Sequence, residues 1–261
     1  MSPSYWIAVP FLNIGSPIHS CQDGVMSTSR SGGRRPKGDS LSRAAIVAAA
    51  VDLLDEAGES GLTVRALAAR LNTGPGSIYW HVGDRSGLLE LACDSVLAEA
   101  VPGTSADGPL GGVDAEGSSA IRAVGLGLYD ALDAHTWAGS LLPRMASVPS
   151  LLRALDRIGT ALTDMGVPEE RQFHSATAVL NYVIGVAGQM SRNAEAAGEG
   201  SNQAEWLDAR ASEWERTDPE EYPFLHRIAG DFRDHDDREQ FVAGLDLIIA
   251  GIVATTSEAD G

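Results

Sequence analysis

The chain has 261 residues, of which 44% are hydrophobic, so it can bury a sizeable core in one or two domains. It carries 19 basic and 36 acidic residues, a formal net charge of −17 at pH 7. That charge excludes a protein that binds nucleic acid without sequence preference through the phosphate backbone. We see no apolar run of membrane-spanning length, and the apolar start, residues 4–15, lacks the basic leader of a signal peptide.

Two cysteines, Cys21 and Cys93, are too few for a disulfide framework. Cys93 falls on an apolar helical stripe with Leu89 and Val96, which predicts a buried free thiol. These features fit a protein of the reducing cytoplasm. Residues 1–39 are rich in Ser, Gly and Pro and have no helical periodicity, so we expect a disordered extension.

Helical periodicity begins just after this extension. We expect a first helix from near Leu41 to Gly58, with Ser40 or Ser42 as its N-cap. Its predicted buried face consists of Ile46, Ala50, Leu53 and Ala57.

Residues 62–91 carry the most informative pattern: two short helices joined by a turn and followed directly by another helix. Thr63 is expected to cap the first of them, and Asn72 stands where the chain must enter the left-handed region. Asp84 is expected to cap the helix that follows, about residues 84–100. The first short helix has one apolar face, formed by Val64, Leu67, Ala68 and Leu71.

The second short helix carries an unusual polar and aromatic row, Ser77 followed by Tyr79, Trp80 and His81. Three adjacent large side chains cannot all face inward on one short helix, so at least two must be exposed. A hydroxyl and an imidazole can donate to phosphates, while aromatic rings pack on sugars and base edges. The row therefore favours double-stranded DNA as a partner.

Residues 41–100 resemble the DNA-binding domain of the tetracycline-repressor (TetR-type) family of bacterial transcriptional regulators. A weaker likeness continues to the C-terminus through 222–223, 231–232 and 241–247. The resemblance implies an all-α protein and no enzyme: three N-terminal helices bind an operator as part of a dimer, and a divergent helical domain binds a small effector. The residues that carry the stronger likeness are Leu62-Thr63, Leu67-Ala68, Leu71, Ile78-Tyr79-Trp80-His81-Val82, Arg85 and Leu88-Leu89.

The resemblance also implies roles for single residues. Arg65 stands where relatives contact a base, and Arg85 resembles a basic residue that grips phosphate at the start of the fourth helix. Residues 74–77 depart from the usual pattern, which shifts sequence readout towards Arg65, the aromatic row and backbone shape. The predicted DNA-binding residues are Arg34, Arg35, Lys37, Thr63, Arg65, Pro75, Gly76, Ser77, Tyr79, Trp80, His81 and Arg85.

The end of the N-terminal extension is basic, with Arg30 beside Arg34, Arg35 and Lys37. We expect this segment to act as a mobile arm on DNA, one that can reach into the minor groove. Met26 begins a segment that looks like an ordinary family N-terminus, so residues 1–25 are expected to be dispensable.

We expect four regions: a disordered extension with the basic arm (1–39), a helix-turn-helix domain (40–100), a linker (101–117) and an effector-binding and dimerisation domain (118–261). Gly166 to Pro168 and Asp218-Pro219 predict helix breaks. No strand pattern competes. The later helices are expected at about 118–134, 138–146, 149–165, 169–196, 203–216, 222–230 and 238–256.

By the same resemblance, the second domain should hold an effector pocket. Asn181 and Gln189 lie two turns apart on one helix, and two buried amides would need a ligand or water as partner. Gly185 lies between them and would allow close approach. The predicted ligand-binding residues are Tyr129, Trp137, Leu141, Met145, Asn181, Tyr182, Gly185 and Gln189.

No metal or other cofactor is expected. The founding members hold a magnesium–drug chelate through a His and a Glu, whereas Asn181 and Gln189 stand nearest those positions here. The remaining histidines are scattered, without a His-x3-His or Cys-x2-Cys pair. The resemblance therefore implies a largely apolar or aromatic effector.

The last predicted helix is apolar on nearly all faces, which suits a homodimer built as a four-helix bundle with residues 169–196. We expect Leu245 and Ile249 to lie in that bundle. The sequence as a whole predicts a repressor that a small effector releases from its operator. An activator, or a regulator without a small effector, remains the alternative. A helical enzyme is disfavoured because no set of titratable residues converges.

Overall fold

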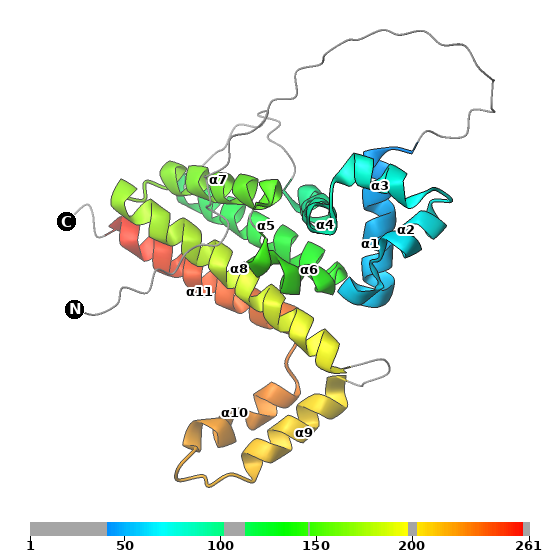
Figure 1. The fold of residues 1–261 in the computed structure, drawn as a ribbon. Coiled ribbons are helices and arrows are strands. Elements are labelled where there is room, and N and C mark those ends of the chain that lie inside the picture. The colour runs from blue at the N-terminus through cyan, green and yellow to red at the C-terminus, as the bar shows by residue number, and fades with distance from the viewer. Residues whose placement is uncertain (1–40, 102–112, 146, 198–202, 258–261) are drawn as a thin grey trace, which may run out of the picture. The chain divides into compact units, whose positions relative to one another are not determined.

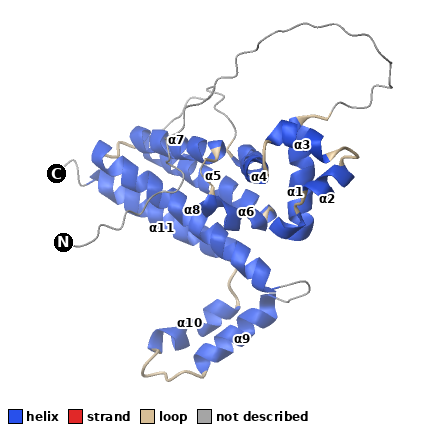
Figure 2. Ribbon diagram, viewed as in Figure 1, coloured by secondary structure: helices blue, strands red, loops and turns tan. Residues whose placement is uncertain are grey.

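The fold comes from a computed structural model, which describes residues 41–101, 113–145, 147–197 and 203–257. Within these ranges every regular element is a helix and no strand occurs (Figures 1 and 2), so the expected all-α class is confirmed. The described residues divide into two compact units. One consists of 41–92 with Met145 and Ser147, and the other of 93–144 with 148–257.

The first unit is built on α1 (Arg43–Gly61), α2 (Val64–Arg70) and α3 (Pro75–Val82). Side-chain caps set where helices begin, because they satisfy amides that have no partner within the helix. The Ser42 hydroxyl accepts from the Ala45 amide at 3.1 Å, which decides between the two caps that the sequence allowed. The Thr63 hydroxyl caps α2 as expected.

The end of α1 differs from the sequence expectation. Ala57 (φ −145°) and Gly58 (φ 61°) leave helical geometry, and the chain then makes one more turn to Gly61. The bend turns Ala57 out of the predicted buried face, so that side chain is exposed. Ile46, Ala50 and Leu53 are buried as expected.

The turn between α2 and α3 has the expected left-handed residue. Asn72 has φ 48°, and the next amide, that of Thr73, donates to the Ala68 carbonyl at 3.0 Å. Asn tolerates this region better than most residues, so the chain can reverse here. Leu67 and Ile78 are almost fully buried and pack α2 and α3 into the core of the unit.

Helix α4 (Arg85–Ala100) begins in the first unit and ends in the second. The Asp84 carboxylate accepts from the Gly87 amide at 2.8 Å, so Asp84 caps this helix as expected. Cys93 is fully buried and is not in a disulfide, also as expected.

The second unit holds the remaining helices. In it, α6 (Thr136–Leu141) packs on α8 (Glu169–Ala197), and α7 (Pro149–Asp164) packs on α5 (Val113–Ala134) and α8. Helix α11 (Asp237–Ser257) also packs on α5 and α8. The expected breaks at Gly166 (φ 74°) and Asp218-Pro219 are present. The predicted helix 138–146 is instead a short α-helix from Thr136 followed by a 3-10 turn. The elements are α5 (Val113–Ala134), α6 (Thr136–Leu141), η1 (Leu142–Arg144), α7 (Pro149–Asp164), α8 (Glu169–Ala197), α9 (Gln203–Glu215), α10 (Pro223–Arg233) and α11 (Asp237–Ser257).

Helices α9 and α10 pack on each other as a hairpin. Arg233 of α10 binds two carboxylates of α9, that of Asp208 at 2.7 Å and that of Glu215 at 3.1 Å. The ring of Phe232, the residue before Arg233, stacks on His235 and meets Trp214 at a tilt, with centroid distances of 5.1 and 4.3 Å. These contacts hold the hairpin together.

Helix α11 is long and apolar enough, by length and composition, to cross a membrane, with a mean hydropathy of 1.4 over Asp237–Thr256. The expectation that no apolar run reaches membrane-spanning length is therefore corrected. Asp246 lies in the middle of the helix and binds Arg122 of α5 with both carboxylate oxygens, at 2.7 and 3.1 Å. One such helix is weak evidence for a membrane protein, because buried and interface helices have the same composition.

Candidate DNA-binding surface and effector domain

The exposed side of α3 carries two large aromatic side chains. Tyr79 is 49% exposed and Trp80 is 81% exposed, whereas Ile78 and Val82 of the same helix are buried. Burial of Ile78 and Val82 fixes the rotation of α3, and this rotation turns Tyr79 and Trp80 outward. His81 is half-buried and meets the Trp80 ring edge-on, with centroids 4.8 Å apart. At least two members of the row are therefore exposed, as expected.

The start of α3 is open to solvent. Gly74 stands at the N-cap and Pro75 at the first helical position, where the missing amide hydrogen of proline costs nothing. No side chain caps the helix, and an added Cβ at Gly76 would meet nothing within 4 Å. Ser77 is exposed. A DNA backbone could approach this turn closely.

The start of α2 lies in the same unit. The Thr63 hydroxyl accepts from the Ala66 amide at 3.1 Å, and the Thr63 side chain is also exposed, so it can serve a helix cap and a phosphate together. Arg65, two residues on, is exposed and makes no hydrogen bond or ion pair within the described part of the chain. Arg70 at the other end of α2 binds Glu56 of α1.

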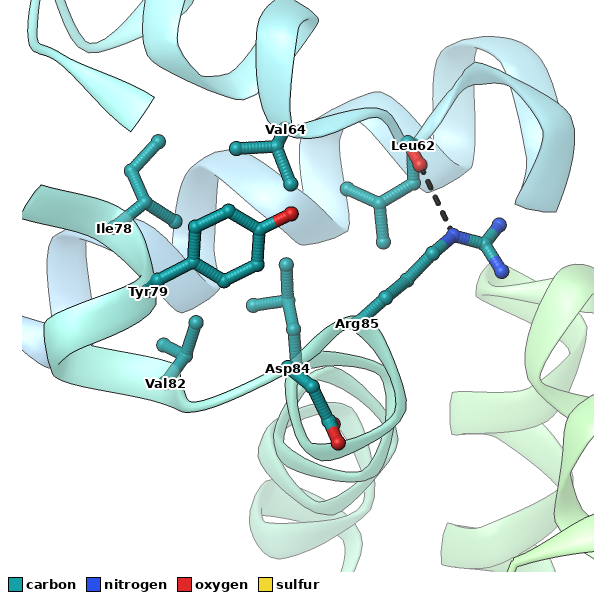
Figure 3. Close-up of a pocket in the computed structure, with 8 residues that line it drawn as sticks. Leu62, Val64, Ile78, Tyr79, Val82, Asp84 and Arg85 are labelled. Atoms are coloured by element: carbon teal, nitrogen blue, oxygen red, sulfur yellow. Dashed lines mark hydrogen bonds between the residues drawn. The ribbon is translucent and has the colours of Figure 1, made fainter. Parts of the chain in front are cut away.

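Arg85 differs from the phosphate-gripping residue that the resemblance implied. Its guanidinium is bound inside the first unit: Nη1 donates to the Glu59 carboxylate at 3.0 Å and Nη2 to the Glu59 carbonyl at 2.7 Å. Nε donates to the Leu62 carbonyl at 3.3 Å, the dashed line in Figure 3. The structure thus gives Arg85 a set of protein acceptors before any DNA is present.

Figure 3 also shows a small, mostly apolar pocket between α2, α3 and the start of α4. The Tyr79 ring crosses one side of it, and Arg85 borders the other. The pocket is a small gap at the packing interface between helices of the first unit. Its lining residues are Leu62, Val64, Ile78, Tyr79, Val82, Asp84, Arg85 and Leu88.

Two predicted features lie outside the described residues. One is the basic arm of Arg34, Arg35 and Lys37 with Arg30, and the other is the stretch 1–25 that the sequence predicts to be dispensable.

Two of the expected effector residues form an aromatic stack that sequence reasoning did not find. Phe241 of α11 lies between Tyr129 of α5 and Tyr182 of α8, with ring centroids 4.3 and 5.3 Å away. Tyr129 and Phe241 are almost fully buried. An added Cβ at Gly244 would collide with the Tyr182 hydroxyl, so this glycine is needed for the close approach. The three rings fill the core between α5, α8 and α11.

The other apolar residues of the expected effector set fall in different units. Trp137 and Leu141 of α6 are buried in the second unit, and the Trp137 ring meets that of His135 at 6.1 Å. Met145 is buried and belongs to the first unit.

The polar members of the expected set face outward, which corrects the prediction that they line an interior. Asn181, Gly185 and Gln189 are all exposed on α8. The inward face of that helix is taken by Val179, Val183 and Ala187, which are buried. Because a helix turns 100° per residue, Asn181, Gly185 and Gln189 fall on the opposite side.

Helix α11 has two apolar faces with different surroundings. Leu245 and Ile249, expected in a dimer bundle, are buried within the chain itself, where Leu245 packs against Gly125 of α5. The opposite face is exposed, and Leu247 there is 75% exposed. The exposed apolar residues of this face form an outer stripe of Ala243, Leu247, Ala250 and Ala254. Successive members of the stripe are four, three and four residues apart.

Among the described residues, no three His, Cys, Asp or Glu side chains gather in a way that could hold a metal ion. His235 lies at the α10–α11 junction, where its Nδ1 is 2.7 Å from the Phe232 carbonyl and its Nε2 3.0 Å from the Asp237 carboxylate. The acidic residues around it, Asp234, Asp236 and Asp237, are exposed.

A helix-turn-helix with an exposed aromatic row, joined to a larger helical unit, is the arrangement of a DNA-binding regulator. Comparison with known families agrees. Residues 46–92 match the model described as bacterial regulatory proteins of the tetR family, and residues 117–256 match the tetracyclin repressor-like C-terminal domain. The chain belongs to the TetR family of transcriptional regulators, which are not enzymes, and the resemblance seen in the sequence is confirmed.

Individual relatives agree along most of the chain. An HTH-type transcriptional regulator of Saccharopolyspora erythraea is 34% identical over 82% of this chain and 86% of its own. A solved TetR regulator of Streptomyces coelicolor is 42% identical with a TM-score of 0.69, covering 83% of this chain and all of that one. ActR of the same organism, solved in complex with actinorhodin, is 28% identical with a TM-score of 0.67, covering 83% and 99%.

Proposed function

We propose that this chain is a homodimeric repressor, released from operator DNA when a small, largely apolar or aromatic effector binds its second unit. The single observation that carries the DNA-binding part is the outward pair Tyr79 and Trp80, held in place by the buried Ile78. Large aromatic side chains rarely stay this exposed on one short helix without a partner. A DNA-bound regulator works where the genome is, in the cytoplasm.

Contacts to DNA divide by chemistry. Arg65 is the proposed base-reading residue, because it is exposed and a guanidinium can bind guanine with two hydrogen bonds. Thr63, Ser77, Tyr79, Trp80 and His81 supply phosphate and sugar contacts, and the open backbone at Pro75 and Gly76 lets DNA come close. The basic arm of Arg34, Arg35 and Lys37 adds a sequence-independent attraction.

The proposed dimer uses the outer stripe of α11 and the exposed face of α8. The stripe has the heptad-like spacing of helices that pack on one another, and Leu247 would enter the partner. Asn181, Gly185 and Gln189 lie on the exposed face of α8, so we assign them to this interface instead of the effector pocket. A second copy is the proposed cover for the apolar face of α11, in place of lipid.

The effector is proposed to act on aromatic and aliphatic side chains in the interior of the second unit: Tyr129, Trp137, Leu141 and Tyr182. Aromatic ligands stack well on such rings. ActR, a relative solved with actinorhodin, supports effector binding by this kind of domain. Since Tyr129 and Tyr182 already stack on Phe241, a ligand there would have to part the rings and so move α5, α8 and α11.

The DNA-binding proposal is tested by selecting duplexes from a random-sequence DNA pool with the purified full chain. We expect enrichment of a site with two symmetric half-sites about one helical turn apart. Failure to enrich any sequence would contradict the proposal. Arg65→Ala should lower affinity for the selected duplex by about 1 to 3 kcal/mol and relax preference at one base pair of each half-site.

The effector proposal is tested by screening small aromatic compounds for a rise in melting temperature without added magnesium. A compound that raises it should also release the selected duplex. Trp137→Phe should weaken that release while leaving DNA affinity unchanged. If stabilising compounds never release DNA, or if the bound chain raises transcription from a reporter, the activator or effector-independent alternative is favoured.

A further inference from the structure

Arg85, the first residue of α4, binds the segment where α1 ends and α2 begins, here called the α1–α2 corner. Its three hydrogen bonds end on Glu59 in the last turn of α1 and on Leu62, the residue just after it. Carbonyls at the end of a helix have no partner within the helix, and a cation there also meets the negative end of the helix dipole. Arg85 therefore caps α1 from the first position of α4.

The corner that Arg85 closes is also where α2 begins. The Thr63 amide donates to the Gly61 carbonyl at 2.9 Å, and the Thr63 hydroxyl caps α2. The acceptors of Arg85, on Glu59 and Leu62, thus lie at the two ends of a turn that finishes three residues before Arg65. Because Ala57 and Gly58 have already broken the helix, the last turn of α1 depends on contacts from outside itself.

We propose that Arg85 is a positioning residue for DNA reading: it fixes the α1–α2 corner, and through it the direction of Arg65, instead of gripping phosphate. The proposal rests on the proposed DNA-binding function. Three of the five N–H donors of the guanidinium bind one carboxylate and two carbonyls, and these bonds hold the side chain against the α1–α2 corner. Lys cannot replace it, because an ammonium lacks the planar fork that reaches three separate acceptors.

The pocket in Figure 3 extends this corner to α3. Leu62 and Arg85 border the same pocket as the Tyr79 ring. The α1–α2 corner and the exposed aromatic row therefore share one packing interface. A shift of Leu62 is therefore expected to reach Tyr79 as well as Arg65.

Salt dependence separates positioning from a phosphate grip. Binding of the selected duplex is measured from low to high salt for the wild-type chain, Arg85→Gln and Arg85→Lys. We expect both variants to lose about tenfold in affinity, as for loss of a charge-assisted hydrogen-bond set, with the salt slope unchanged. A phosphate grip predicts instead a slope reduced by about one for Arg85→Gln and affinity restored by Arg85→Lys. That second result, or no loss in either variant, overturns the proposal.

A double-mutant cycle measures the coupling between Arg85 and Arg65, which a general loss of folding stability would not change. If Arg85 acts by directing Arg65, then Arg65→Ala should cost clearly less in the Arg85→Lys background than in the wild type. Additive losses overturn the proposal. Circular dichroism confirms that each variant is folded, and Arg85→Lys carries the test if Arg85→Gln does not fold. A wild-type chain that enriches no duplex would instead refute DNA binding itself, so the two failures are distinguishable.

Discussion

The Tyr182 hydroxyl donates to the carbonyl oxygen of Phe241 at 3.1 Å, and the two rings stack with centroids 5.3 Å apart. Phe241 presents its other side to Tyr129, 4.3 Å away. Three helices thus meet through three aromatic rings and one backbone acceptor. Any ligand that enters this core must separate rings that stabilise one another, which couples occupancy to the spacing of α5, α8 and α11.

Alkaline pH should destabilise the fold through Tyr129. Burial, with the negative charge of Asp133 as the second cause, raises the pKa of this phenol to about 12. In the unfolded chain the pKa is about 10, so above that pH the unfolded state loses its proton first and is favoured. The stabilising contribution is complete below pH 10 and is lost as the pH rises towards 12. Unfolding by urea as a function of pH should show this decline.

Tyr129→Phe is the matched variant, since it keeps the ring and its stack on Phe241. The loss of stability between pH 10 and 12 should be shallower than in the wild type. Tyr222→Phe, a change at an exposed tyrosine, serves as the control. An equally steep decline for Tyr129→Phe and the wild type would show that another group dominates.

The two faces of α11 should respond in opposite ways to substitution. Leu247→Arg places a charge on the exposed stripe, so the dimer should dissociate while the melting temperature of the folded chain changes little. Leu245→Ala removes buried methyl groups against Gly125 and should cost about 2 to 5 kcal/mol of unfolding free energy. Light scattering and thermal unfolding measure both. A dimer that survives Leu247→Arg would contradict the proposed interface.

Dissociation should also remove operator binding, because two half-sites must be held together. The DNA-binding unit is unaltered in Leu247→Arg. The monomer should therefore still bind a single half-site, with the weak affinity of an isolated DNA-binding domain. Ala209→Arg, at an exposed position of α9, provides a control for added positive charge.

Local signals in the sequence predicted most of the helix boundaries. Ser42, Thr63 and Asp84 cap helices through side chains only three residues from their partners, and Gly166 ends α7 through its own backbone. Such signals act within one turn, so they can be read without knowing the fold. The same is true of Asn72 in the helix-turn-helix.

Long-range contacts set the features that the sequence did not predict. Which side of α8 turns inward depends on α5, α6 and α7 packing against it, and this decided the exposure of Asn181 and Gln189. The partners of Arg85 depend on the bend at Ala57 and on Glu59, 26 residues earlier. Periodicity identifies an apolar face but does not say which of two faces a neighbour will cover.

Asp94 should stabilise the second unit by capping α7 from α4. Its carboxylate accepts from the Ser150 amide and from the Ser150 hydroxyl, both at 2.6 Å, at the first turn of α7. Ser150 is fully buried, so no water can replace the carboxylate as acceptor for its amide. Asp94→Ala should lower the unfolding free energy by about 1 kcal/mol, as for loss of a helix cap. Chemical denaturation measures the change.

Asp156→Ala is the control, because it removes an exposed carboxylate from the middle of α7 without touching a cap. Asp94→Asn should retain part of the effect, since an amide oxygen can still accept one hydrogen bond. Equal stability of Asp94→Ala and Asp156→Ala would mean that the cap contributes nothing.

The basic arm should contribute to DNA binding through charge alone. A chain that lacks residues 1–25 keeps Arg30, Arg34, Arg35 and Lys37 and should bind the selected duplex as the full chain does. A chain that lacks residues 1–38 loses all four, so its affinity should fall and its salt slope should flatten by up to about 0.9 for each phosphate contact removed. Fluorescence anisotropy over a range of salt concentrations measures both quantities. Because the charges act on the backbone, the loss should be the same for the selected and a scrambled duplex. A loss confined to the selected duplex would mean that the arm reads sequence in a groove, and an unchanged slope would mean that it does not touch DNA.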